Sequence, residues 1–341
     1  MKSSNPPLRL AFAGFRHGHI YSLYNLAKQE PTIEIVAACE EDAGTRQQMA
    51  NGPVAVTHDN HRRMLEEVPC EAVAVGDYYG ARGAIIIEAL RRGKHVIGDK
   101  PLCTSADELA VIARLAREQH LAVGCQLNLR DHPAFRAMHA ALRDGAIGTV
   151  LAIAFTGQHS LNYGTRPAWY FEPGKHGGTI NDIAIHALDF ILWATGCRIA
   201  RVNAARVWNA NLPQVPWFQD GAQMMLTLDN GAGVLGDVSY FVPATVDCAL
   251  PQGWRFTCWG SEGILEGGVN SPPMLYRSGK NAAETLPPPE ATTGNYLQSF
   301  LDEIRGNAAA VTLSTQDVLE SARAALAVQH AADHGLTNVE V

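Results

Sequence analysis

Residues 8–19, LRLAFAGFRHGH, decide the fold, because an apolar segment leads through a glycine into a helical pattern. The segment Leu8–Ala13 predicts a buried strand that ends at Gly14. Apolar residues then recur at helical spacing, at Ile20, Leu23, Tyr24 and Ala27. This strand, turn and helix predict the first unit of a parallel α/β sheet.

The same alternation of strands and helices continues to about residue 126. Further strands are predicted at Ile33–Cys39, Ala72–Val75, His95–Ile97 and Ala122–Cys125. One of the helices between them begins with the capping pair Ser105 and Glu108. Such alternation predicts a doubly wound parallel sheet, in which ligands bind outside the carboxyl ends of the strands.

The pattern changes after residue 126, where a helix at Pro133–Arg143 precedes longer strands. These are predicted at Val150–Phe155, Ile199–Val207, Ala222–Leu228, Gly233–Tyr240, Trp254–Trp259 and Ile264–Glu266. Hairpin-type turns such as Asp229-Asn230-Gly231 predict that this sheet is mostly antiparallel. We therefore predict an α/β protein with two domains, residues 1–126 and residues 127–341.

The last part of the chain is predicted less directly. The segment Asn270–Pro289 carries five prolines and is expected to be a surface loop. Helical patterns follow near Tyr296–Arg305 and Thr315–Ala332. Thr315 has no acidic capping partner at Val318, so the start of the last helix stays open.

Composition and charge limit the classes of function. The 341 residues are 47% hydrophobic and 18% charged with a net charge of −7, which argues against nucleic acid or an anionic membrane as the main partner. No apolar run reaches the roughly 18 residues that a membrane span needs, and we expect no secretory signal. The seven cysteines favour a reduced, cytoplasmic setting, because they form no C-x-x-C pair. They are Cys39, Cys70, Cys103, Cys125, Cys197, Cys248 and Cys258.

The loop Gly14–His19 is the first candidate site. A dinucleotide-binding loop needs glycines for a tight turn and for close approach of backbone N–H groups to a diphosphate. The G-x-G-x-x-G pattern is incomplete, because Arg16 and His19 stand at its third and sixth positions, and an ordinary strand–helix turn is the alternative. Glu40 ends the second strand 22 residues after Gly18, near the position of an acid that holds a ribose diol. It favours NAD over NADP.

Two further segments carry candidate catalytic residues. In GKHVIGDKP (residues 93–101), Lys100 ends a buried strand, where an ammonium group is costly to desolvate unless it has a function. In HGGTINDIAIHALD (residues 176–189), helical spacing places Asp182, His186 and Asp189 on one face, and a carboxylate beside an imidazole suits a general base. The alternatives are ordinary ion pairs on the surface. No third metal-ligating residue follows at a spacing that is typical of a metal site, so we predict that no metal is bound here.

Together these segments resemble the Gfo/Idh/MocA oxidoreductases over nearly the whole chain. The resemblance rests on GKHVIGDKPL and, about 80 residues later, GGTINDIAIHALDFILWATG. It implies a Rossmann domain followed by an α+β domain with an open sheet, which often forms the contact of a homodimer or homotetramer. It also implies NAD(P)-linked hydride transfer to or from a secondary alcohol of a sugar, cyclitol or related polyol.

The resemblance also implies roles for single residues. Lys100, Asp182 and His186 are expected to be catalytic: His186 takes the hydroxyl proton, Asp182 orients it, and Lys100 stabilises the alkoxide. With the loop analysis, cofactor contacts are expected at Gly14, Phe15, Arg16, His17, Gly18, Glu40, Gly76, Asp77 and Lys100. Substrate contacts are expected at Arg130, His159, Tyr163, Trp169 and His176, and Trp169 suits packing equally well.

The chain departs from the family pattern at several positions. Asp99 replaces the usual Glu, and His176 replaces the first of three glycines. Where a Thr-Pro-Asn-type segment usually lies against the nicotinamide ribose, the chain has Gly76-Asp77-Tyr78-Tyr79, with Arg82 where a His is common. These changes concern the cofactor contacts more than the catalytic residues.

Two other functions stay open. A glycosidase or epimerase that retains NAD and oxidises its substrate transiently would release no NADH. A non-catalytic NAD(P)-binding regulator is the second alternative, and the retained Lys100, Asp182 and His186 speak against it.

Overall fold

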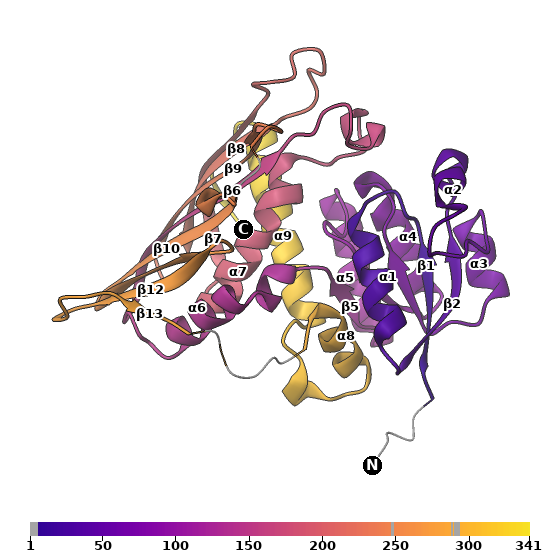
Figure 1. Ribbon diagram of the computed structural model, residues 1–341, viewed down its shortest axis with the longest axis horizontal. Coiled ribbons are helices and arrows are strands. Elements are labelled where there is room, and N and C mark those ends of the chain that lie inside the picture. Colours follow the sequence, from indigo (N-terminus) through magenta and orange to yellow (C-terminus); the bar gives the residue numbers. More distant parts are fainter. Residues whose placement is uncertain (1–5, 247–248, 288, 290–293) are drawn as a thin grey trace. The chain divides into compact units, whose positions relative to one another are not determined.

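A computed structural model describes residues 6–246, 249–287, 289 and 294–341 of the chain. The chain forms two compact units, drawn in Figure 1. Unit 1 comprises Met1–Gln126, Gly174–His176 and Tyr296–Leu319, and unit 2 comprises Leu127–Pro173, Gly177–Asn295 and Glu320–Val341. The first segment of unit 1 ends at Gln126, and the unit also includes Gly174–His176 and Tyr296–Leu319, which we expected in the second domain.

Unit 1 contains the predicted parallel sheet, with the strand order β2-β1-β3-β4-β5. The strands are β1 Leu8–Ala13, β2 Ile33–Cys39, β3 Ala72–Val75, β4 His95–Gly98 and β5 Val123–Cys125. The helices are α1 His19–Gln29, α2 Ala43–Met49, α3 His61–Glu67, α4 Tyr79–Arg91, α5 Ala106–Gln119 and α8 Tyr296–Ile304. The chain runs from β1 outward to β2 and then back to β3, so the topological switch point lies between β1 and β3.

The last part of the chain completes unit 1 because α8 packs on β5 and β4. Phe300 of α8 is buried, and Gly124 of β5 leaves room for its ring, since a Cβ at Gly124 would come within 2.9 Å of it. The Val123 N–H also donates to the Thr315 hydroxyl at 2.8 Å. A boundary at residue 126 therefore divides a unit whose core needs residues 296–319.

Unit 2 contains a nine-stranded sheet with the order β13-β12-β11-β10-β6-β9-β8-β7-β14. Its neighbours are antiparallel except for β6 and β9, which are parallel. The strands are β6 Val150–Ser160, β7 Ile199–Trp208, β8 Gly221–Leu228, β9 Gly233–Val242, β10 Trp254–Gly260, β11 Gly263–Gly268, β12 Ser271–Arg277, β13 Glu284–Thr285 and β14 Thr337–Glu340. The predicted mostly antiparallel sheet is confirmed.

One face of this sheet is covered by helices and the other is bare (Figure 1). The covering helices are α6 Pro133–Arg143, α7 Ile185–Thr195 and the C-terminal part of α9 Thr315–Asp333. Side chains alternate accordingly along β9, where Val234 and Val238 are buried and Leu235 between them is exposed. Short helical turns complete the unit: η1 Asn128–Asp131, η2 Ala168–Phe171, the π-helical η3 Ile180–Ala184 and η4 Pro251–Gly253, while η5 Ala308–Ala310 lies in unit 1.

The prediction of a surface loop at Asn270–Pro289 is wrong for its first part, which forms β12 and β13. Two prolines fit into β12 because the β11–β12 register is irregular between Glu266 and Gly268. Pro272 and Pro273 lie opposite this irregularity, where the ladder does not require their missing N–H groups. Pro288, like Cys248, lies outside the described residues.

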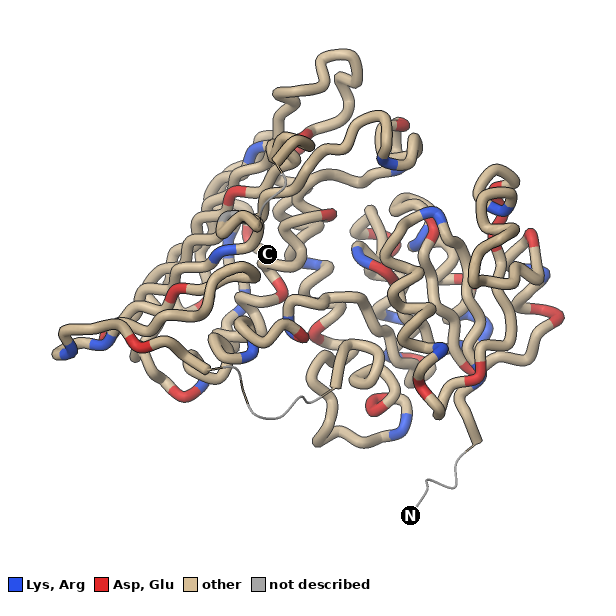
Figure 2. Tube along the Cα trace, viewed as in Figure 1, with Lys and Arg blue, Asp and Glu red and all other residues tan. Residues whose placement is uncertain are grey.

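Three general expectations can be compared with the described chain. Blue and red segments are interspersed along both units in Figure 2. The cysteines at 39, 70, 103, 125, 197 and 258 are free. Within the described ranges, no helix is long and apolar enough to cross a membrane.

Candidate active site

The loop after β1 meets the loop after β3 at the switch point of unit 1. Gly14 adopts φ +83°, and a Cβ there would lie 2.7 Å from the Cβ of Asp77. A Cβ at Gly76 would come within 2.4 Å of Ile20 on α1. Glycine is therefore required at both positions, for a positive φ and for close packing of helix on strand.

This edge of the sheet fits a dinucleotide. The carboxyl ends of β1 and β3 are adjacent, and α1 begins directly after the glycine turn. The N-cap residue of α1, Gly18, provides no side-chain cap, and the first turn contains no acidic residue. The positive end of the helix therefore has no anion from its own first turn, which is the arrangement that phosphate groups use.

Glu40 lies at the end of β2 as predicted, and its carboxylate is fully buried. One oxygen accepts a hydrogen bond from the Phe15 N–H at 2.6 Å, and the other accepts one from the Asp42 N–H at 2.8 Å. Burial raises the pKa of Glu40, and these two backbone donors oppose the rise. Glu40 thus stabilises the loop that follows β1 through its hydrogen bond with Phe15. The sequence analysis did not predict this role. Its contact with a ribose diol stays a prediction.

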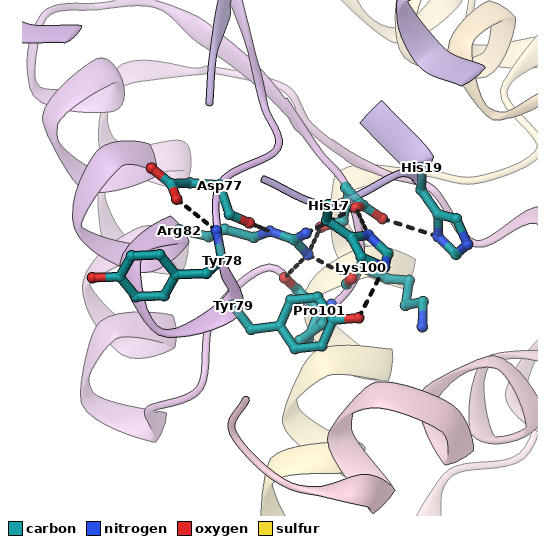
Figure 3. Close-up of polar contacts among 9 residues, drawn as sticks. His17, His19, Asp77, Tyr78, Tyr79, Arg82, Lys100 and Pro101 are labelled. Carbon is teal, nitrogen blue, oxygen red and sulfur yellow. Dashed lines mark hydrogen bonds and ion pairs between the residues drawn. The ribbon is translucent and has the colours of Figure 1, made fainter. Parts of the chain in front are cut away.

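Lys100 follows β4 on a segment that Arg82 holds (Figure 3). The fully buried guanidinium of Arg82 donates to the carbonyls of Asp99, Lys100 and Pro101, and to the Asp99 carboxylate at 2.8 Å. Its Nε donates to the Asp77 carbonyl at 2.7 Å. The backbone on both sides of Lys100 is therefore fixed by one side chain.

His17 joins the loop after β1 to the same network. Its Nδ1 is hydrogen-bonded to Asp99 Oδ2, and its Nε2 lies 3.2 Å from the hydroxyl of Tyr79 (Figure 3). Tyr79 is fully buried at the start of α4, and the Lys100 Nζ lies 6.0 Å from its ring centroid. The candidate cofactor loop and the lysine segment thus share one hydrogen-bonded cluster.

The charges in this cluster are set by burial and by Arg82. Burial lowers the pKa of His17 to about 4, although the Asp99 carboxylate raises it. Burial alone would raise the pKa of Asp99, but the Arg82 guanidinium and His17 outweigh it and hold that pKa well below the usual range. At neutral pH the cluster therefore contains a neutral His17 and a charge-balanced Asp99–Arg82 pair.

In unit 2, Asp182 and His186 lie where a π-helical turn passes into α7. Asp182 belongs to η3 and His186 to the first turn of α7, and both are buried. The Tyr240 hydroxyl on β9 donates to Asp182 Oδ2. Burial, followed by the Asp182 charge, raises the pKa of Tyr240 well above its ordinary value, so the phenol keeps its proton and stays a donor.

Aromatic rings from the sheet surround these residues. Trp254 on β10 packs edge-on against His186 at 5.7 Å and against His159 on β6 at 5.6 Å. His159 also lies 6.5 Å from the Tyr240 ring. The predicted residues Asp182, His186 and His159 are thus in one cluster of unit 2, together with two aromatic residues that the sequence analysis missed.

Asp189 has a structural partner instead of a place beside His186. Its carboxylate accepts hydrogen bonds from the Arg130 guanidinium at 2.7 to 3.2 Å and from the Ser321 hydroxyl at 2.9 Å. Arg130 and Asp189 are both buried, and the guanidinium also lies over the Trp193 ring at 5.3 Å. The structure therefore gives Arg130 a buried ion pair, and its contact with a substrate stays a prediction.

The other predicted substrate residues differ in exposure. Tyr163 is half exposed and packs edge-on against Phe171 at 4.8 Å. Trp169 is only 2% exposed and lies 4.2 Å from Tyr170, which is the packing arrangement that the sequence left as the alternative. His176 belongs to unit 1, with its ring 5.5 Å from that of Tyr79.

One group of metal-ligating side chains occurs among the described residues, formed by His17, His19 and Asp99. Its carboxylate is already neutralised by Arg82 at 2.8 Å. A divalent cation would add charge beside that guanidinium, so we assign no metal to this group.

Some residues of the candidate site were not predicted, and the sequence contains different amounts of information about them. Arg82 and Asp99 were visible as departures from a family pattern, but their mutual contact joins α4 to the end of β4. Tyr240 and Trp254 had no local signal, because their relation to Asp182 and His186 depends on strand order.

Two family models match the chain. The model of the oxidoreductase family with an NAD-binding Rossmann fold, GFO_IDH_MocA, matches residues 8–127, and the GFO/IDH/MocA C-terminal domain matches residues 135–266. The two matches are consecutive and together cover more than half of the chain. The chain belongs to the GFO/IDH/MocA family of NAD-binding oxidoreductases.

Several curated relatives are dehydrogenases. The levoglucosan dehydrogenase of Pseudarthrobacter phenanthrenivorans is 26% identical over 182 residues, which are 52% of this chain and 45% of that protein. Inositol 2-dehydrogenase 1 of Saccharopolyspora erythraea is 25% identical over 248 residues, 67% of this chain and 70% of that protein. The chain thus spans less than half of the first relative and about two thirds of the second.

Solved structures support the fold. An inositol dehydrogenase homologue from Azotobacter vinelandii, complexed with NAD+, has a TM-score of 0.82 at 18% identity and covers 100% of this chain and 99% of its own. An aldose–aldose oxidoreductase from Caulobacter crescentus has a TM-score of 0.77 at 18% identity, with 98% and 100% covered. At this identity the likeness establishes the fold alone.

Proposed function

We propose that the protein is an NAD-dependent dehydrogenase that acts on a secondary alcohol of a sugar, cyclitol or related polyol, or on the corresponding ketone. The observation that carries the proposal is the Lys100 segment, which Arg82 fixes beside the candidate cofactor loop of an NAD-binding Rossmann domain. The names of the relatives, a levoglucosan and an inositol dehydrogenase, support this substrate class.

The proposed mechanism gives each of three residues one task on the same alcohol. His186 accepts the hydroxyl proton as the general base. Asp182 orients His186, and the Tyr240 hydroxyl keeps the Asp182 carboxylate in place. Lys100 donates a hydrogen bond to the reacting oxygen and stabilises the charge that develops there. Bound nicotinamide supplies the hydride chemistry.

The cofactor is held in this proposal by unit 1. The glycine turn at Gly14 and the N-terminus of α1 receive the diphosphate, with Phe15, Arg16, His17 and Gly18 lining the loop. Gly76 and Asp77 lie beside it. A carboxylate at Glu40 repels a 2′-phosphate, so we expect NADH to bind more tightly than NADPH.

The assembly and setting are also part of the proposal. The bare face of the nine-stranded sheet exposes apolar residues, and we propose that it forms the contact of a homodimer or homotetramer. The exposed residues are Leu151, Met225, Leu235, Trp259, Ile264 and Tyr276. A cytoplasmic location, expected from the scattered cysteines, belongs to the same proposal.

The test is a panel of sugars, sugar acids and inositols, offered with NAD and with NADP and followed by the absorbance of the reduced cofactor. We expect oxidation of at least one member with NAD. The variant Lys100→Met should lose at least about 100-fold in kcat while it binds NADH nearly as well as the wild type.

Lys94→Met is the matched control, because Lys94 precedes β4 and its Nζ donates to the Cys70 carbonyl instead. It should keep wild-type kcat. Activity that survives in Lys100→Met contradicts the role of Lys100. A product that forms without NADH, or no turnover of any panel member, contradicts the proposed reaction.

A further inference from the structure

His19 occupies an unusual position at the N-terminus of α1. Its imidazole side chain is 46% exposed, whereas those of His17 and Asp99 beside it are 9% and 0% exposed. Its Nδ1 lies 3.4 Å from Asp99 Oδ1, and its ring packs edge-on against His17 at 4.4 Å. In Figure 3 the rest of the ring points away from the network. One nitrogen is thus anchored and the other side of the ring is accessible.

Asp99 Oδ1 is a buried acceptor that no hydrogen bond satisfies among the described residues. The other oxygen, Oδ2, already accepts from Arg82 and His17. A buried oxygen of this kind favours a donor, and His19 Nδ1 lies 3.4 Å from it. We therefore place the Nδ1 proton of His19 toward Asp99.

This placement decides what His19 can do for an anion. A neutral imidazole that donates through Nδ1 presents a lone pair at Nε2, which repels a phosphate oxygen. An imidazolium ion donates from both nitrogens, to Asp99 through Nδ1 and to a phosphate through Nε2. An anion at the start of α1 therefore favours the protonated ring.

We assign this proton uptake to His19 because the charged groups around it are already neutral or paired. His17 on the same loop stays neutral, since burial lowers its pKa to about 4. Asp99 after β4 is balanced by Arg82 of α4 at 2.8 Å, and α1 itself offers no acid in its first turn. Arg16 on the same loop pairs with Asp42 at 3.7 Å.

We propose that His19 binds the diphosphate of the dinucleotide and takes up a proton from the buffer when the dinucleotide binds. The imidazolium group supplies a charged donor in a loop that lacks its second glycine. This inference rests on the cofactor of the proposed function, but it requires no substrate and no turnover.

The test measures NADH binding by calorimetry at pH 7.5 in two buffers of different ionisation enthalpy, which counts the protons taken up. ADP-ribose, which carries the diphosphate without the nicotinamide, is titrated in parallel. We expect the wild type to take up a substantial fraction of one proton with either probe. Its affinity for NADH should weaken by up to about tenfold from pH 6 to pH 8.5.

His19→Gln should take up no proton, bind NADH about tenfold more weakly than the wild type at pH 6, and approach it at pH 8.5. His330→Gln, which removes an exposed histidine of α9, is the control and should match the wild type. Thermal unfolding verifies that both variants are folded.

Three results overturn the inference: no proton uptake by the wild type, unchanged uptake in folded His19→Gln, or no binding of NADH at all. The last result also removes the cofactor from the proposed function. Proton-linked binding in a protein that oxidises no sugar or cyclitol would leave the inference intact and contradict the proposed function.

Discussion

At the scale of single residues, Arg82 shows how one buried side chain fixes the backbone around a candidate catalytic residue. Its guanidinium neutralises Asp99 and donates to three consecutive carbonyls around Lys100. A buried carboxylate without such a partner would be strongly destabilising. A guanidinium carries five N–H donors and an imidazole at most two, so Arg82 can serve the Asp99 carboxylate and the three carbonyls at once.

The buried His17 makes stability depend on pH. Its pKa is lowered to about 4, whereas an imidazole in the unfolded chain titrates near 6.5. Above pH 6.5 both states are neutral there. Between pH 6.5 and pH 4 only the unfolded state binds this proton, so the free energy of unfolding falls as the pH falls, by up to about 3 kcal/mol.

Urea unfolding at pH 7, 5.5 and 4.5 measures this effect. His17→Asn keeps a donor near Asp99 without a titrating ring, and should flatten the decline. The second strongly lowered histidine, His139, remains in the variant, so some decline persists. The exposed His334→Gln serves as the control and should follow the wild type. An equal decline in His17→Asn would show that His17 is not the group responsible.

The sequence predicts which candidate residues lie on one helix face better than it predicts the partners of each. Helical spacing singles out Asp182 and His186, since residues four apart on a helix are neighbours. Spacing also placed Asp189 beside them, whereas its carboxylate in fact binds Arg130 and Ser321. Those contacts span 59 and 132 residues of chain, and no local pattern contains them.

At the scale of elements, most strands and helices of both units could be predicted because apolar periodicity marks each of them. The exceptions have local causes. The π-helical η3 shifts the helical phase around Asp182, and the prolines of β12 sit at a register irregularity. The pair Thr315 and Val318 does not mark the start of α9, because the capping pair is Ser314 and Asp317, one residue earlier.

That cap gives a prediction about α9. The Ser314 hydroxyl accepts from the Asp317 N–H at 3.2 Å, and the Asp317 carboxylate accepts from the Ser314 N–H at 2.9 Å. Ser314→Ala removes one half of this capping box, and should lower the free energy of unfolding by about 1 kcal/mol. Urea unfolding measures the loss. Ser278→Ala, at an exposed position outside any helix, should change nothing, and equal stability of both variants would exclude the cap.

At the scale of the whole molecule, the two sheets bury their residues differently. The strand β3 is buried along its whole length, as expected of a parallel sheet covered on both faces. The nine-stranded sheet alternates buried and exposed residues, and its exposed side is unusually apolar. A hollow of about 640 Å³ on β6 to β9 is lined by Met225, Leu235 and Arg206 among others.

An apolar face of this kind predicts self-association. Leu235 is 59% exposed and Met225 48% exposed on neighbouring strands, and a stable interface needs about 800 Å² from each partner, which a nine-stranded face can supply. Leu235→Glu places a charge in the middle of this face, where an opposing copy would have to desolvate it. Sedimentation velocity should show a homodimer or homotetramer for the wild type and a smaller species for the variant.

Leu336→Glu is the matched control, because Leu336 is 39% exposed but lies between α9 and β14 rather than on a strand of the sheet. It should sediment like the wild type. Circular dichroism of Leu235→Glu should stay that of the wild type, since the substitution leaves the buried face of β9 untouched. A monomeric wild type, or a folded Leu235→Glu that sediments unchanged, would mean that the bare face of this sheet does not hold copies together.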